Sequence, residues 1–144
     1  MIKAIFRKSN KLLRSLRLLK SWGSLRRLKP FSNKFGYDRG NQSIARYYID
    51  NFMQENAPFI TGKILEIGDD TYTKRFGKDI SYSDVLHVRE GNPKATIVTD
   101  LTCDTTIPDE TYNCILLPQT LQCIYDIRSA VFNCHRILRH NGVL

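Results

Sequence analysis

The sequence of 144 residues predicts an α/β fold in which helices flank a mostly parallel sheet. Short apolar runs that suit buried strands alternate with stretches of helical periodicity. One such run ends in Glu66 and Gly68 and turns sharply, and acids recur at Asp84 and Asp100, where two later strands are expected to end. A glycine turn followed by acids at successive strand ends indicates a nucleoside-shaped ligand across the carboxyl edge of the sheet.

The expected elements begin with a helix that Ser43 can cap and that stops near residues 57–58. Its buried side is expected to carry Ile44, Tyr47, Tyr48 and Phe52. Strands are expected at 63–67, 80–85 with an extension toward Val88, 95–99 and 112–117, and helices at 73–76 and 127–139. Asn141-Gly142 is expected to end the last helix, after which Val143-Leu144 begins a fifth strand.

The first 30 residues form a separate basic arm in this prediction, ahead of a domain at 31–144. Residues 1–29 hold ten basic side chains and no acid, which leaves 12 basic and 14 acidic residues in the rest of the chain. Apolar residues recur in the arm at helical steps: Ile2, Ile5, Leu12, Leu16, Leu19 and Trp22. Such a helix could lie on an anionic membrane, dock on a partner protein, pack on its own domain or serve as an organellar presequence. Nucleic acid is the least favoured partner, because no aromatic residues are interleaved with the basic ones.

The remaining composition excludes several classes of protein. No apolar run approaches the roughly 20 residues that cross a bilayer. The four cysteines, at 103, 114, 123 and 134, lack the spacing of a metal or redox site, so we expect reduced, mostly buried thiols and no metal. We therefore expect a cytoplasmic protein, with peripheral membrane association through residues 1–29 as an open alternative.

Charge at the glycine turn favours one class of nucleoside ligand. Asp69 and Asp70 follow Gly68, and at contact distance each carboxylate repels a phosphate by roughly 1 kcal/mol in water and about 4 kcal/mol in a partly buried site. A dinucleotide is therefore disfavoured, and with it a nucleotide-dependent oxidoreductase or epimerase. S-adenosylmethionine has no phosphate and carries two cationic groups, so an acidic turn suits it.

Several segments resemble successive motifs of class I S-adenosylmethionine-dependent methyltransferases of the type 11 family, which have a Rossmann-like fold. They are Ile-Leu-Glu-Ile-Gly at 64–68, Thr-Asp-Leu-Thr at 99–102, Ile-Pro-Asp-Glu-Thr-Tyr-Asn-Cys-Ile at 107–115 and His-Arg-Ile-Leu-Arg-His-Asn-Gly-Val-Leu at 135–144. Residues 35–40 and 46–50 are similar to the lead-in of a subgroup often associated with glycan-modifying enzymes. The resemblance covers about residues 35–144.

The resemblance implies a role for seven residues in binding S-adenosylmethionine. These are Glu66 for the methionine amino group, Gly68 and Asp70 for the turn beside the donor, Asp84 for both ribose hydroxyls, Asp100 for the adenine amino group, Leu101 for the adenine ring and Gln119 for the methionine end or the acceptor. We expect the carboxylates of Glu66, Asp84 and Asp100 to surround one cavity at the rim of the sheet.

The implied activity is transfer of a methyl group to a small-molecule or glycan acceptor. No catalytic residue or general base can be named from the sequence. The family core has seven strands and this sequence reaches only the fifth, so we expect a partial, apparently truncated domain that is incomplete on its C-terminal side. The alternative is a catalytically inactive methyltransferase-fold module that docks on a membrane or partner through its basic arm.

Overall fold

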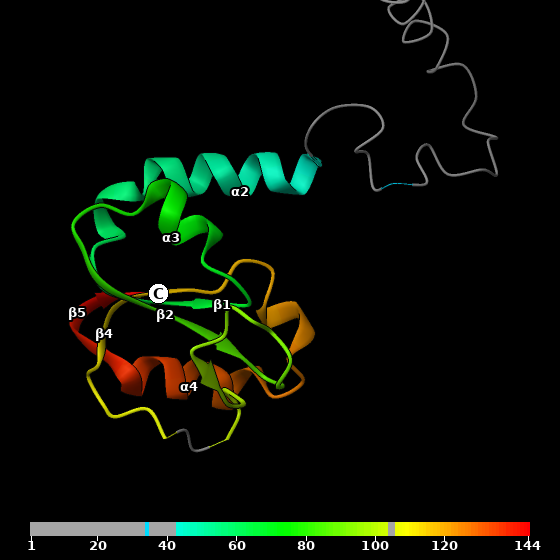
Figure 1. The fold of residues 1–144 in the computed structure, drawn as a ribbon, viewed down its shortest axis with the longest axis vertical. Coiled ribbons are helices and arrows are strands. Elements are labelled where there is room, and N and C mark those ends of the chain that lie inside the picture. Colours follow the sequence, from blue (N-terminus) through cyan, green and yellow to red (C-terminus); the bar gives the residue numbers. More distant parts are fainter. Residues whose placement is uncertain (1–33, 35–42, 104–105) are drawn as a thin grey trace, which may run out of the picture. The chain divides into compact units, whose positions relative to one another are not determined.

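The computed structural model describes residues 34, 43–103 and 106–144, and the fold below is that of residues 44–144 (Figure 1). The predicted basic arm at 1–30 and the segment 35–40 lie outside the described residues. In the part of the chain that is described, no helix is both long enough and apolar enough to cross a membrane.

Five parallel strands form one sheet in the order β3-β2-β1-β4-β5. Their bounds are Gly62–Ile67 for β1, Ile80–His87 for β2, Ile97–Val98 for β3, Tyr112–Leu116 for β4 and Leu138–Val143 for β5. The chain builds outward from β1 to β3 on one side and then returns to place β4 on the other side of β1. This confirms the predicted Rossmann-like α/β fold and puts a reversal of strand order between β1 and β4.

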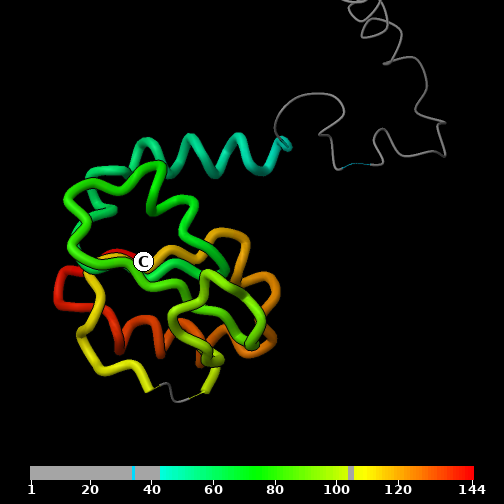
Figure 2. The backbone as a smooth tube through the Cα atoms, in the orientation of Figure 1, coloured from blue at the N-terminus to red at the C-terminus, as the bar shows by residue number. Residues whose placement is uncertain are grey.

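Helices cover both faces of the sheet. The helix α2 (Ile44–Glu55), the 3-10 turn η1 (Ala57–Phe59) and the short helix α3 (Thr71–Phe76) lie on one face, and α4 (Ile127–Ile137) lies on the other (Figure 1). A second 3-10 turn, η2 (Leu121–Cys123), lies between β4 and α4. The backbone trace shows the same three layers (Figure 2).

Alternate residues of the central strand supply the two halves of the core. Leu65 packs with Ile115 and the buried residues of α4, whereas Ile64 packs with Met53 and Tyr72 on the opposite face. Ile64 and Leu65 are both fully buried because successive side chains of a strand point to opposite faces. Full burial of each stabilises the fold by about 1.5–3 kcal/mol.

The predicted buried side of the first helix is wrong. Its four predicted members are exposed by more than half: Ile44 by 80%, Tyr47 by 55%, Tyr48 by 67% and Phe52 by 61%. The helix instead turns Met53 and the partly buried Ile49 toward the sheet, in line with Ala57. Apart from Tyr47, both sets recur every four residues, so the sequence offers two overlapping stripes and the structure buries the second.

The last helix ends earlier than predicted. Its final residue is Ile137, and Leu138 is already extended, so Asn141-Gly142 lies inside β5 rather than at a helix end. Thr111 N donates to Ile137 O at 2.8 Å, which starts the pairing of β4 with β5. Gly142 is needed for close approach, because a Cβ there would lie 2.9 Å from the carbonyl oxygen of Arg139.

The cysteine prediction is half right. Cys114 and Cys134 are buried, whereas Cys103 and Cys123 are exposed, and all four thiols are free.

Candidate functional site

A cavity of about 520 Å³ opens at the carboxyl edge of the sheet. Its walls come from the ends of β1 and β2, the segment after β3 at Thr99–Thr102 and the loop between β4 and α4. This is the edge at which the strand order reverses, which is where open α/β sheets bind their ligands.

Gly68 forms the turn at the edge of this cavity. Its φ of +91° is a conformation that residues with a Cβ rarely adopt. Its N–H donates to Leu86 O at 2.9 Å and its carbonyl accepts from Asn92 Nδ2 at 2.6 Å. Two hydrogen bonds therefore hold the turn in place, and an added Cβ would meet nothing within 4 Å.

Asp100 and Leu101 line the same cavity, as predicted. One carboxylate oxygen of Asp100 accepts from both the N–H and the hydroxyl of Thr102, each at 2.8 Å. These hydrogen bonds lower the pKa of Asp100, so its carboxylate is ionised at neutral pH. Leu101 is 4% exposed and presents an apolar wall beside that charge.

A second carboxylate, that of Asp126 at the start of α4, also lines the cavity. It caps α4 by accepting from Ser129 Oγ at 2.7 Å and from Ser129 N at 3.1 Å. These bonds to Ser129 lower the pKa of Asp126, so it too is ionised at neutral pH. Among the described residues that line the cavity there is no lysine or arginine, so this lining is acidic.

Glu66 does not reach the cavity, so its predicted placement is wrong. The side chain is fully buried, and its two carboxylate oxygens accept from Tyr72 N at 3.0 Å and Thr73 N at 2.8 Å. These N–H groups belong to the first turn of α3 and have no hydrogen-bond partner within the helix. The carboxylate of Glu66 is that partner, and its negative charge also interacts favourably with the helix dipole. Burial raises the pKa of Glu66, although the two backbone hydrogen bonds oppose that shift.

Asp84 was expected to end the second strand, and that expectation is also wrong. The strand continues to His87, because Leu86 and His87 pair with the two residues of β3. Asp84 is 6% exposed and accepts from Tyr112 Oη at 2.7 Å and Thr96 Oγ1 at 2.8 Å. Its carboxylate therefore has protein partners inside the fold.

The two remaining predicted residues lie outside the cavity lining. Asp70 pairs with Lys74 at 2.5 Å and with Lys94 at 3.4 Å, and these lysines, Lys74 above all, lower its pKa. Gln119 is exposed in the loop after β4, with a φ of +54°. The structure thus brings Gly68, Asp100 and Leu101 together and leaves the other four predicted residues elsewhere.

Sequence reasoning missed three notable residues of the cavity. His87 stands at the rim where Asp84 was expected, and its Nδ1 lies 2.7 Å from the carbonyl oxygen of Arg89. The sequence did indicate that His87 could lie in this strand, because the strand was expected to extend toward Val88. Asp126 could have been found from the Ser three residues later, a spacing typical of a helix start, but Tyr125 has no such signal.

Comparison with known proteins gives a match to a family model. A search of curated proteins found no similar sequence. The family model described as a methyltransferase domain matches residues 60–144, which include all five strands and every residue of the cavity. Since this match covers more than half of the chain, the protein belongs to the methyltransferase domain family.

Proposed function

We propose that this protein binds S-adenosylmethionine in the cavity at the carboxyl edge and transfers its methyl group to a small-molecule acceptor. The family generally uses this donor. The observation that carries the proposal is the acidic lining of the cavity at the strand-order reversal, with Asp100 and Asp126 as its carboxylates.

The cavity residues fit this donor better than a phosphate-bearing nucleotide. The donor is cationic at its sulfur and amino group, and both carboxylates of the lining attract such charges. A pyrophosphate would be repelled by about 1 kcal/mol per carboxylate in water and about 4 kcal/mol in a partly buried site. The lining residues within 43–103 and 106–144 include no lysine or arginine that would offset this repulsion.

The chain's own residues would bind and orient the donor. Gly68 lets the backbone approach it, Asp100 offers a fixed acceptor, and Leu101 offers an apolar surface for a flat ring. When bound, S-adenosylmethionine supplies a methyl group that is activated by positively charged sulfur. The protein's main tasks are then to position the acceptor and to exclude water.

Calorimetry with S-adenosylmethionine tests this proposal on the full chain. Asp100→Ala should weaken binding roughly tenfold or more, because it removes a charge-assisted hydrogen-bond acceptor from the cavity. Asp70→Ala is the matched control, an acid of the same sheet edge outside the cavity lining, and should bind like the wild type. No binding by the wild type would refute the proposal and favour a catalytically inactive module, and tighter binding of NAD would favour a dinucleotide enzyme.

A further inference from the structure

Both backbone polar groups of Gly68 are held by β2 and the loop that follows it. The N–H of Gly68 donates to Leu86 O at 2.9 Å, and its carbonyl oxygen accepts from Asn92 Nδ2 at 2.6 Å. A glycine has no Cβ to restrict its backbone, so the orientation of this turn depends on such bonds. Gly68 lines the cavity at the carboxyl edge, whereas Asn92 is not among the described residues of that lining. The amide of Asn92 therefore meets the cavity through Gly68.

The loop between β2 and β3 fixes the orientation of the Asn92 amide. Asn92 Oδ1 accepts from Lys94 N at 3.0 Å, and the carbonyl oxygen of Asn92 accepts from Ala95 N at 3.1 Å. An asparagine followed by a proline, as at Asn92-Pro93, is typical of the first two positions of such a turn. Because the amide oxygen already accepts from a backbone N–H, the amide presents its NH₂ group to Gly68 as a donor.

A second contact joins the same two segments but contributes less. Lys94 Nζ lies 3.4 Å from Asp70 Oδ1, and the two side chains are 51% and 22% exposed. A pair that is exposed to this extent adds little, because solvent screens the charges and the lysine loses side-chain entropy. The amide of Asn92 is therefore the main contact by which this loop holds the Gly68 turn.

We propose, on the basis of the function proposed above, that Asn92 is a positioning residue for the methyl donor. Its amide holds the carbonyl of Gly68 in the orientation in which the backbone of the turn meets the donor. Without this bond the glycine turn samples other orientations, and the apparent affinity for the donor falls with the competent fraction. A neutral hydrogen bond changes an equilibrium constant by about two- to twelvefold, and this is the loss of affinity that we expect.

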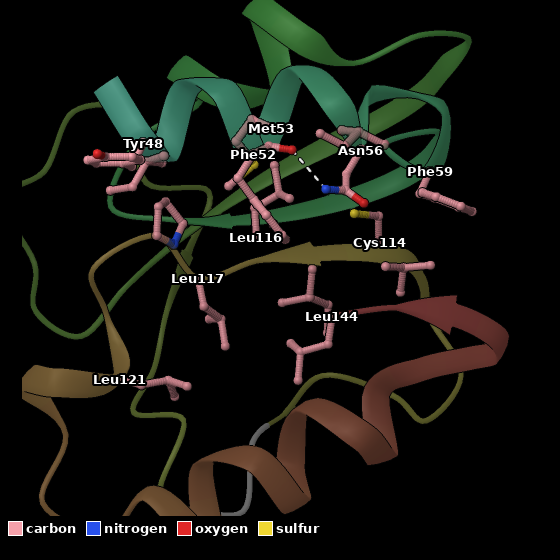
Figure 3. A pocket seen from close by; sticks show the side chains of 15 residues that line it. Tyr48, Phe52, Met53, Asn56, Phe59, Cys114, Leu116, Leu117, Leu121 and Leu144 are labelled. Carbon is pink, nitrogen blue, oxygen red and sulfur yellow. Dashed lines mark hydrogen bonds between the residues drawn. The ribbon is translucent and has the colours of Figure 1, made fainter. Parts of the chain in front are cut away.

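Asn56 provides a matched amide away from this cavity. Its Nδ2 also donates to a backbone carbonyl, Phe52 O at 2.8 Å, in the last turn of α2 (Figure 3). Asn56 borders a separate hollow of about 720 Å³ between α2, β4 and β5, and it is not among the described residues that line the cavity at the carboxyl edge (Figure 3). Asn56→Ala therefore removes the same kind of hydrogen bond without a change at Gly68.

Calorimetry with S-adenosylmethionine on the full chain compares three variants. Asn92→Ala should weaken binding about two- to twelvefold, and Asn56→Ala should bind like the wild type. Asn92→Asp keeps the acceptor for Lys94 N but places a carboxylate oxygen against the carbonyl oxygen of Gly68. The added negative charge alone would tighten the binding of a cationic donor, whereas lost positioning weakens it. Tighter or unchanged binding by Asn92→Asp overturns the proposal.

Hydrogen exchange at the N–H of Gly68, followed by NMR, distinguishes positioning from a purely structural role. Exchange should be about two- to twelvefold faster in Asn92→Ala than in the wild type and unchanged in Asn56→Ala. Saturating S-adenosylmethionine should slow this exchange by a larger factor in Asn92→Ala than in the wild type, because coupling between the donor and the turn is reciprocal. A purely structural role would leave the effect of the donor the same in both proteins, and that result overturns the proposal.

The wild-type titration separates this role from the function on which it rests. Thermal melts followed by circular dichroism first establish that all three variants are folded at the temperature of the titrations. If the wild type then binds no S-adenosylmethionine, the proposed function fails and the role of Asn92 fails with it. If the wild type binds the donor and both Asn92 variants bind it equally well, the role of Asn92 is overturned while the proposed function stands.

Discussion

The hydroxyl of Tyr112 donates a hydrogen bond of 2.7 Å to Asp84 Oδ2, and the two side chains meet across the central strand β1. Both are buried, at 1% and 6% exposure. The hydroxyl of Thr96 donates a hydrogen bond to the other carboxylate oxygen. Asp84 therefore connects β2, β4 and the residue before β3. Burial, and then the bond to Asp84, raises the pKa of Tyr112, so its hydroxyl is protonated and donates this hydrogen bond at neutral pH.

Tyr112→Phe should therefore reduce stability without affecting donor binding. The change leaves one buried oxygen of Asp84 without its partner, at a cost of about 1–3 kcal/mol in the free energy of unfolding. Urea denaturation measures that loss, and calorimetry should give an affinity for S-adenosylmethionine within about twofold of the wild type. Loss of donor affinity with unchanged stability would show instead that Asp84 acts on the ligand.

Glu66→Gln should change how stability depends on pH. A glutamine can accept from only one of the two N–H groups that Glu66 now satisfies, so we expect the variant to be less stable by about 1–3 kcal/mol. Burial raises the pKa of Glu66 in the folded state above 4.5, so the folded state holds this proton more tightly than the unfolded state. The resulting stability is present below pH 4.5 and is lost as the pH rises through the raised folded-state pKa.

The glutamine side chain of Glu66→Gln has no proton that titrates, so the variant lacks this contribution to the pH dependence of stability. The stability of the wild type minus that of Glu66→Gln should therefore decrease as the pH rises from about 4.5 to neutral, in denaturation series at several pH values. A difference that grows over the same range would mean that the backbone hydrogen bonds outweigh burial and lower the pKa.

Gly68→Ala and Gly91→Ala form a matched pair. Both glycines have positive φ, +91° and +100°, and an added Cβ meets nothing within 4 Å at either position. Each change should cost about 1–2 kcal/mol through backbone strain alone. Of the two glycines, Gly68 lines the cavity and Gly91 does not, so only Gly68→Ala should also weaken the binding of S-adenosylmethionine in calorimetry. Equal affinities of the two variants would place the donor away from this turn.

The positions of the strands and their parallel arrangement could be predicted from sequence because they follow from local patterns. Apolar runs such as Ile64-Leu65 mark buried strands, and Gly68 marks the turn at the edge of the sheet. The parallel arrangement then follows from the alternation of strands with helices or long connections. These features need no knowledge of distant contacts.

The predictions that failed depend on contacts between distant residues. Asp84 has the local pattern of an acid at a strand end, but its partner Tyr112 lies 28 residues away and draws it into the core. The buried stripe of α2 was equally ambiguous, because two stripes of the same period overlap and only packing against α3 and the sheet selects between them. Local pattern thus located the carboxyl edge but not which carboxylates line the cavity there.

The four cysteines provide a test of the cavity that requires no substitution. Burial raises the pKa of Cys114 and of Cys134 to about 11, whereas Cys103 and Cys123 are exposed. Because the thiolate is the reactive form, Ellman's reagent should modify two thiols rapidly and the buried pair only on unfolding. Cys123 lines the cavity at the carboxyl edge and Cys103 does not, so saturating S-adenosylmethionine should slow the labelling of Cys123 alone. Mass spectrometry assigns the labelled peptides, and equal slowing at Cys103 would point to a change of the whole fold rather than to a ligand in this cavity.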